Sequence, residues 1–204
     1  EVLPLLGSAE ELFHIHSCLL DPGDVALVPD PAYPAYAAGV ANAGGVEVKV
    51  PLLEENNFLP DLSAIPQDVA RQAKMIWVNY PNNPTSAVVE DGDDFSERAV
   101  HFAKTYDIAV VSDNAYSELT YDGYVAPSFL ETPGAKDIGV EFWSFSKPFN
   151  MTGWRCGFVA GNELIVKAYG DVKDNTDSGQ FLAIQHAALR LRERDTERDR
   201  DRKP

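Results

Sequence analysis

Short runs of β-branched and apolar residues alternate along this chain with stretches of helical periodicity. Six runs have the length and composition of strands: 25–28, 46–50, 75–78, 108–112, 140–145 and 156–160. Three stretches have a helical pattern of apolar residues: 9–20, 33–43 and 94–105. Alternating strands and helices form right-handed crossovers, which build a mostly parallel sheet covered on both faces. We therefore expect a three-layer α/β/α fold with ligands beyond the carboxyl ends of the strands.

The balance of charge limits which partners this fold can bind. The chain has 204 residues, of which 45% are hydrophobic and 24% are charged, and its formal net charge is −15. Because nucleic-acid binding relies on clustered lysine and arginine, this acidic balance argues against a nucleic-acid partner. No apolar run has the length of a membrane span and no leader opens the chain, so we expect no membrane partner and a cytoplasmic location.

The two cysteines, Cys18 and Cys156, lie far apart in the sequence. Their spacing matches neither a disulfide framework nor a metal site. We therefore expect two reduced core thiols and no metal.

The last fifteen residues differ from the rest of the chain. Residues 190–204 are almost all charged, with alternating sign. A segment of this kind is too polar to pack and is typical of disorder or of a solvated helical extension. We predict one domain over residues 1–189, followed by a charged, disordered tail over residues 190–204.

Four polar motifs follow predicted strands or open a helix, where this architecture places a ligand site. They are GSAEEL (7–12), PDPAYPAY (29–36), NYPNNPTS (79–86) and SDNAYSEL (112–119). Taken singly, each has an ordinary structural explanation: a helix cap, a packed surface tyrosine, a rigid turn and a capping aspartate. Together they bring amide, hydroxyl, aromatic and carboxylate groups to one edge of the sheet.

A fifth motif adds a reactive amine to this set. The segment SFSKPFNMTGWRCG, residues 144–157, places Lys147 behind two serines and Arg155 beside glycines. A lysine, a carboxylate and an anion clamp match the needs of pyridoxal 5'-phosphate (PLP). In PLP enzymes a lysine forms a Schiff base and an aspartate or arginine partners the pyridine nitrogen. We therefore expect PLP as the cofactor.

A rival interpretation is acyl transfer by a serine nucleophile. The segment 144–147 matches S-x-x-K and the segment 112–114 matches S-D-N, the motifs of serine β-lactamases. In those enzymes S-x-x-K comes first along the chain, whereas here it comes second and no K-T-G follows. The order of the motifs argues against this interpretation.

The motifs NYPNNPT, SDNAY and SFSKxxxMxGWRxG, in this order, resemble those of the class I/II PLP-dependent aminotransferases of fold type I. The sequence around these motifs is similar to that of the branch with LL-diaminopimelate and aspartate aminotransferases; it includes LLDPGDVALVPDPAYPAY and PGAKDIGVEFWSFSK. The resemblance runs from Leu6 to about Leu189. It implies the central, PLP-binding large domain of such an enzyme, with the small domain missing.

The resemblance implies three catalytic residues. Lys147 matches the lysine that forms the internal aldimine and then moves a proton between the substrate Cα and the cofactor. Asp113 matches the aspartate that keeps the pyridine nitrogen protonated, so that the ring accepts the electron pair released at Cα. Tyr116 matches the tyrosine that hydrogen-bonds the phenolic oxygen of the cofactor.

The resemblance also implies how the cofactor is held. Tyr33 matches the aromatic residue that stacks on the ring, and Asn83 matches a second partner of the phenolic oxygen. Arg155 matches the arginine that clamps the phosphate. The remaining phosphate partners on this pattern are Ser8, Ala9, Ser144 and Ser146.

The implied activity is transfer of an amino group between an amino acid and a 2-oxo acid by a homodimer. Segment 173–181 is a candidate for approaching the neighbouring subunit's phosphate, although a plain loop explains it equally. PLP-dependent lyases and synthases share the same fold and cofactor residues, so they remain an alternative. A cofactor-domain remnant that serves only as an interaction module is a third possibility.

Two departures from the family pattern affect the expected activity. The turn usually read NPTG is NPTS here, so Ser86 replaces a glycine suited to positive φ, and a shifted turn would displace Asn83. The family's N-terminal arm and C-terminal small domain, with the arginine for the substrate α-carboxylate, have no counterpart among these residues. We therefore expect part of the PLP site to be retained and transamination to be poor or absent.

Overall fold

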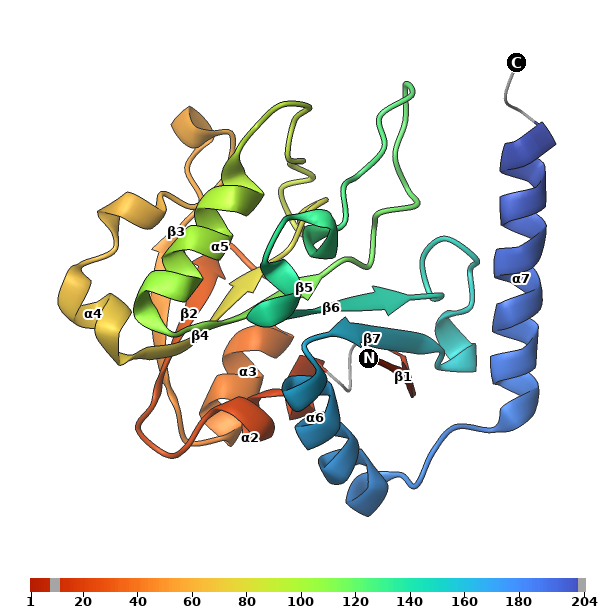
Figure 1. The fold of residues 1–204 in the computed structure, drawn as a ribbon, viewed down its shortest axis with the longest axis horizontal. Helices are drawn as coiled ribbons and strands as arrows, with labels where there is room; N and C mark the ends of the chain where they lie inside the picture. Colours follow the sequence, from red (N-terminus) through yellow and green to blue (C-terminus); the bar gives the residue numbers. More distant parts are fainter. Residues whose placement is uncertain (8–11, 202–204) are drawn as a thin grey trace.

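One seven-stranded sheet forms the centre of the molecule (Figure 1). The computed structural model describes residues 1–7 and 12–201, with side chains up to residue 193. The sheet has the order β1-β7-β6-β5-β4-β2-β3. The strands are β1 (Val2–Leu5), β2 (Val25–Asp30), β3 (Val46–Pro51), β4 (Ala73–Val78), β5 (Ala109–Asp113), β6 (Gly139–Ser144) and β7 (Gly157–Gly161). All six predicted strands are present, and the expected α/β fold with a mostly parallel sheet is confirmed.

Strand direction explains why one edge of the sheet collects the polar motifs. Strands β2 to β6 are parallel, and β7 runs antiparallel to both β6 and β1. The carboxyl ends of the parallel strands therefore meet the start of β7 at a single edge. Strand β1 was not predicted; it is short, contains Pro4 and buries only Leu5, as suits a sheet edge.

Helices cover both faces of the sheet (Figure 1). Helices α2 (His16–Leu19), α3 (Ala35–Asn42) and α6 (Glu163–Thr176) contribute to the apolar core on one face. Helices α4 (Gln67–Gln72) and α5 (Phe95–Tyr106) contribute to the core on the other. Short 3-10 turns complete the chain: Glu54–Asn56, Leu62–Ala64, Phe129–Glu131, Ala135–Asp137 and Thr152–Trp154.

Two of the predicted helices correspond to α3 and α5, and the third is partly described. Within the stretch predicted over 9–20, residues 12–14 are helical and α2 follows a turn at Ile15, while residues 9–11 lie outside the described part. Helices α4 and α6 were not predicted. The buried side of α6 consists of only Val166, Tyr169 and Lys173, which is too sparse to give a clear apolar stripe.

Side chains alternate between the two cores along each strand. In β5, Val110 packs in the core that contains α5, whereas Val111 packs in the core that contains α3. Residues two positions along a strand share a face, so Ser112 follows Val110 and Asp113 follows Val111. This alternation directs neighbouring polar groups to opposite sides of the sheet.

Neither cysteine forms a disulfide: Cys156 is buried and Cys18 is half-buried. Burial raises the pKa of the Cys18 thiol to about 11. A thiol with a raised pKa is a poor nucleophile, which fits the core role expected for it.

The charged carboxyl-terminal segment has a helical backbone as far as Asp201, in helix α7 (Leu182–Asp201). Residues 202–204 lie outside the described part, and the expectation of a disordered tail over 190–204 stays a prediction. Ile184, Ala188 and Leu191 pack in a small cluster with Phe145 and Met151, which attaches the start of α7 to the body. The division at residue 189 stays a prediction. Among the described helices, none has the length and apolar character needed to cross a membrane.

Candidate active site

A cavity of about 190 Å³ opens at the edge where the parallel strands end. Every predicted site residue that the structure describes borders it: Tyr33, Asn83, Asp113, Tyr116, Ser144, Ser146, Lys147 and Arg155. Leu12, Ala115 and Thr152 complete the lining. Ser8 and Ala9 lie outside the described residues. The fold thus places residues from all five sequence motifs around one cavity.

Asp113 ends strand β5 with its side chain buried beside the cavity; the residue is 4% exposed. Its Oδ2 atom accepts a hydrogen bond of 2.7 Å from the Tyr36 hydroxyl. Its Oδ1 atom is buried and makes no hydrogen bond within the described part of the chain. Because a buried polar atom without a partner is costly, Oδ1 is suited to receive a donor from a ligand.

Burial raises the pKa of the Asp113 carboxyl to about 6. The Tyr36 hydroxyl, the Ala115 amide and the positive charge of Lys147 oppose this shift, and the charge of Glu141 adds to it. A positive charge placed next to Oδ1 would stabilise the ionised carboxylate. The site therefore favours a cationic N–H donor over a neutral one.

Tyr36 was not among the predicted site residues, yet its hydroxyl donates to the Asp113 carboxylate and orients it. The Tyr36 ring stacks on Trp77 at 4.2 Å, and Trp77 Nε1 donates to His16 Nε2 at 3.0 Å. Burial, followed by the charge of Asp113, raises the pKa of the Tyr36 hydroxyl, so this group stays a donor. Tyr36 lies three residues after Tyr33 in PDPAYPAY, a signal that could have drawn attention to it.

The turn that carries Asn83 is anchored to the same strand end. Asn79, also missed, donates from Nδ2 to the Asp113 carbonyl at 2.7 Å, and its Oδ1 accepts from the Asn83 amide at 2.8 Å. Ser86 adopts φ 61, the left-handed conformation that the family's glycine would favour. The substitution therefore leaves Asn83 at the cavity, contrary to the displacement we considered.

Lys147 lies in the turn after β6, on the same cavity as Asp113. Its Nζ atom is 5.5 Å from the centroid of the Tyr116 ring, within the range of a cation–π contact. Ser144, at the end of β6, accepts a hydrogen bond of 3.2 Å from the Ser146 amide through its Oγ atom. The amine, the phenol and the hydroxyls thus occupy one side of the site.

Arg155 is held at the start of β7 in a left-handed backbone conformation, with φ 53. Its Nη1 atom donates to the Thr152 carbonyl at 2.9 Å, and its backbone carbonyl accepts a hydrogen bond from Gln180 Nε2. A Cβ atom added to Gly7, which has φ +85, would lie 2.5 Å from Arg155 Nη2. The guanidinium therefore packs closely on the chain that follows β1, and glycine is required there.

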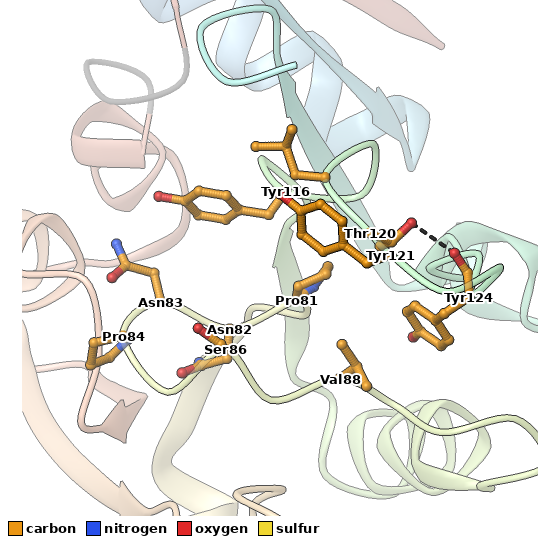
Figure 2. Close-up of a pocket in the computed structure, with 11 residues that line it drawn as sticks. Pro81, Asn82, Asn83, Pro84, Ser86, Val88, Tyr116, Thr120, Tyr121 and Tyr124 are labelled. Carbon is orange, nitrogen blue, oxygen red and sulfur yellow. Dashed lines mark hydrogen bonds between the residues drawn. The ribbon is translucent and has the colours of Figure 1, made fainter.

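A second, larger cavity of about 470 Å³ adjoins the first and shares Asn83 and Tyr116 with it (Figure 2). Its walls come from the 81–88 turn and the 116–124 part of the loop after β5. Its lining consists of aromatic, apolar, amide and hydroxyl side chains, with no charged side chain among the residues that border it. No cluster of potential metal ligands occurs in the part of the chain that the structure describes.

The side chains around this cavity could hold a flat, anionic, nitrogen-containing ligand. Arg155 and the serine hydroxyls supply donors for an anion, and Asp113 Oδ1 supplies an acceptor for a ring N–H. Lys147 borders the same cavity and carries a primary amine. The group implied by the sequence resemblance, PLP, has a phosphate, a ring nitrogen and an aldehyde, so the residues present fit it.

Comparison with known proteins supports the same family. The family model described as aminotransferase class I and II matches residues 1–202. The chain is 54% identical over 189 residues to an LL-diaminopimelate aminotransferase of Moorella thermoacetica, covering 93% of this chain and 48% of the relative. It is 52% identical over 204 residues to the LL-diaminopimelate aminotransferase of Aquifex aeolicus, covering 98% of this chain and 52% of the relative.

Solved structures show the same arrangement of strands and helices. Substrate-bound BacF from Bacillus subtilis superposes with a TM-score of 0.88 and 42% identity, over 92% of this chain and 47% of that one. A probable N-succinyldiaminopimelate aminotransferase from Thermus thermophilus gives a TM-score of 0.85 and 39% identity, over 90% of this chain and 49% of that one. The chain spans about half the length of the relatives it matches. It belongs to the class I and II aminotransferases.

Proposed function

We propose that this chain supplies the PLP site of a transaminase that moves an amino group between an amino acid and a 2-oxo acid. The observation that carries the proposal is the buried Oδ1 atom of Asp113, which has no hydrogen-bond donor among the described residues, in a residue that borders the same cavity as Lys147 and Arg155. A structural aspartate would have both oxygens satisfied. An aspartate that binds a ligand is expected to have one oxygen without a protein donor when the ligand is absent.

The residues that would hold PLP divide by chemistry. Arg155, Ser144 and Ser146 would bind the phosphate, and Asp113 would bind the ring nitrogen. Tyr33 would pack against the ring, and Asn83 and Tyr116 would donate to its phenolic oxygen. When bound, PLP supplies an electron sink that stabilises negative charge at the substrate Cα.

Each side chain then has a defined part in moving protons. The Lys147 amine would act as the general base that takes the proton from the substrate Cα, and it would return that proton to the reacting molecule. The ionised Asp113 would favour a protonated ring nitrogen, and the Tyr36 hydroxyl, which donates to Asp113 Oδ2, would keep that carboxylate oriented. Anchoring both ends of the ring fixes the geometry in which the proton is removed.

The relatives' names point to the substrate class. Two proteins that share more than half of their aligned residues with this chain are named LL-diaminopimelate aminotransferases. We propose an amino acid of that class as the amino donor, a homodimer as the working assembly and a cytoplasmic location. Because the chain spans about half of these relatives, the activity is proposed for the protein to which these residues contribute.

Borohydride reduction tests the role of Lys147. The chain is mixed with PLP, reduced and digested, and the labelled peptide is identified by mass spectrometry. We expect the label on Lys147, no label at that peptide in Lys147→Ala, and normal labelling in the control Lys136→Ala, whose exposed side chain lies outside the cavity. A label spread over surface lysines would contradict the proposal.

The reaction class is tested separately, without reduction, on the full-length protein to which these residues contribute, loaded with PLP. Addition of LL-diaminopimelate should convert PLP to pyridoxamine phosphate and release a 2-oxo acid in equal amount. A lyase would consume the amino acid while the cofactor stays PLP. Binding without any turnover would favour the remnant that serves as an interaction module.

A further inference from the structure

The carboxylate of Glu141 has four hydrogen-bond donors. It lies in β6 and is 1% exposed. Its Oε1 atom accepts from Asn114 Nδ2 at 3.1 Å and from Ser128 Oγ at 2.7 Å. Its Oε2 atom accepts from Ser112 Oγ at 2.9 Å and from the Phe129 amide at 2.7 Å. Four donors satisfy the lone pairs of an ionised carboxylate, which compensates for its burial.

Two of these donors flank Asp113 in the sequence. Ser112 pairs with Glu141 across the sheet, and Asp113 pairs with the next residue, Phe142. Because successive side chains of a strand point to opposite faces, Glu141 holds Ser112 and Asn114 on the face away from Asp113. Fixing both neighbours leaves the Asp113 carboxylate one direction in which to point, toward the cavity.

The same carboxylate closes the base of the loop between β5 and β6. Residues 115–127 form this loop, with Asn114 before it and Ser128 and Phe129 after it. Figure 1 shows it rising from the edge of the sheet, and Figure 2 shows its residues Tyr116, Thr120, Tyr121 and Tyr124 along the larger cavity. Glu141 therefore bonds to both ends of the loop that carries Tyr116.

We propose that Glu141 is a positioning residue for the PLP site, which directs Asp113 and Tyr116 into the cavity by binding both neighbours of Asp113 and both ends of the 115–127 loop. The proposal rests on the proposed function, because it assigns Glu141 a part in a site for PLP. Glu141 touches neither the cavity nor a ligand, since it does not border the space that Asp113 and Lys147 share. Its positioning effect is transmitted through the residues it holds, in addition to the direct effect of its charge on the pKa of Asp113.

A purely structural carboxylate would stabilise the fold without affecting the site. The two roles are separated by a control variant with a similar loss of stability elsewhere. Val100→Ala removes apolar volume from α5 in the core on the same face of the sheet as Glu141, and Val100 contacts neither cavity. A structural role for Glu141 predicts that Glu141→Ala and Val100→Ala behave alike once both are folded.

The experiment measures two quantities on the wild-type chain, Glu141→Ala, Glu141→Gln and Val100→Ala. Hydrogen exchange without PLP reports order in residues 115–127, and a PLP titration followed by absorbance reports affinity. We expect Glu141→Ala to lose protection in the loop and to bind PLP on the order of tenfold more weakly, the scale seen when a partner that orients a ligating group is removed. Val100→Ala should match the wild type in both.

Glu141→Gln supplies a conservative rescue. The amide keeps one acceptor oxygen for the Phe129 amide, which cannot turn, while the hydroxyls and the Asn114 amide can rotate to accept. We expect affinity between those of the wild type and Glu141→Ala. If Glu141→Ala does not fold, Ser112→Ala removes a single donor beside Asp113 and should weaken PLP binding several-fold with unchanged loop protection.

The outcomes separate this proposal from the proposed function. Wild-type affinity and loop protection in Glu141→Ala, or equal losses in Val100→Ala, would overturn the positioning role. If the wild-type chain binds no PLP, the proposed function fails and with it the assignment of Glu141 to a PLP site. Loop protection in Glu141→Ala would then still decide whether this carboxylate orders residues 115–127.

Discussion

Two buried carboxylates, Asp113 and Glu141, lie on adjacent strands and opposite faces of the sheet and have different sets of partners. Glu141 accepts four hydrogen bonds from the protein, whereas Asp113 accepts one from a side chain and its Oδ1 has no donor within the described part of the chain. Burial raises the pKa of both carboxyls. The difference teaches that hydrogen-bond satisfaction, rather than burial, separates a carboxylate that serves the fold from one that serves a ligand.

The contrast predicts opposite effects on stability when each carboxylate is removed. The largest effect is expected for Glu141→Ala, because four donors lose their acceptor at roughly 1–3 kcal/mol each, partly recovered by water. We expect the free energy of unfolding to fall by about 4 kcal/mol in a urea titration. Asp61→Ala, which removes an exposed carboxylate that caps a 3-10 turn, should cost about 1 kcal/mol. A similar loss in both variants would break the comparison.

Asp113→Asn should instead stabilise the chain without PLP. The folded-state pKa of Asp113 is raised from 3.8 to about 6, so its neutral form is favoured on folding. Its contribution to stability is therefore present below about pH 4 and is lost as the pH rises through 6. A shift of about 2 pKa units corresponds to about 3 kcal/mol, so Asp113→Asn should gain up to that amount at about pH 8.

Two further measurements sharpen this prediction. The gain of Asp113→Asn should shrink as the pH approaches about 4, where the wild-type carboxyl is also neutral in the fold. PLP should stabilise the wild type more than Asp113→Asn, because the amide carries no charge to pair with a protonated ring nitrogen. A loss of stability in Asp113→Asn at the higher pH would show that the carboxylate serves the fold after all.

A smaller effect is expected for Tyr36→Phe, which deprives Asp113 of its side-chain donor. The hydroxyl stabilises the ionised form, so its removal should raise the pKa of Asp113 beyond about 6. We expect a loss of about 2 kcal/mol at about pH 8 and a smaller loss near pH 4, measured by urea titration at both pH values. Tyr121→Phe, at a side chain that is 78% exposed, should change neither value. A loss independent of pH would mean that Tyr36 acts through packing alone.

Much of the fold could be predicted because its signals are local. The runs that became β2 to β7 carry their own strand composition, and the helical patterns of α3 and α5 repeat within about a dozen residues. The sequence did not predict elements with weak local patterns, such as β1, which contains a proline, and α6, which has a sparse apolar face. Their formation depends on the sheet edge and core against which they pack.

The candidate site was predictable for the residues that sit in motifs after strands. Three residues were not predicted because their roles depend on partners distant in the sequence: Tyr36, Asn79 and Glu141. Tyr36 meets Asp113 across 77 positions, and Asn79 meets it across 34. No local pattern marks such a pair, since any strand or helix can carry a tyrosine, asparagine or glutamate.

The sequence by itself determined which chemical groups stand at the strand ends, because strand composition and turn residues act over a few positions. Only the tertiary structure decided that the Asp113 carboxylate lies at the cavity with one oxygen available to a ligand, and that the Glu141 carboxylate accepts four hydrogen bonds from the protein. The physical reason is that hydrogen-bond satisfaction depends on donors from β5, α3 and the turn after the 115–127 loop, which meet only when the sheet assembles.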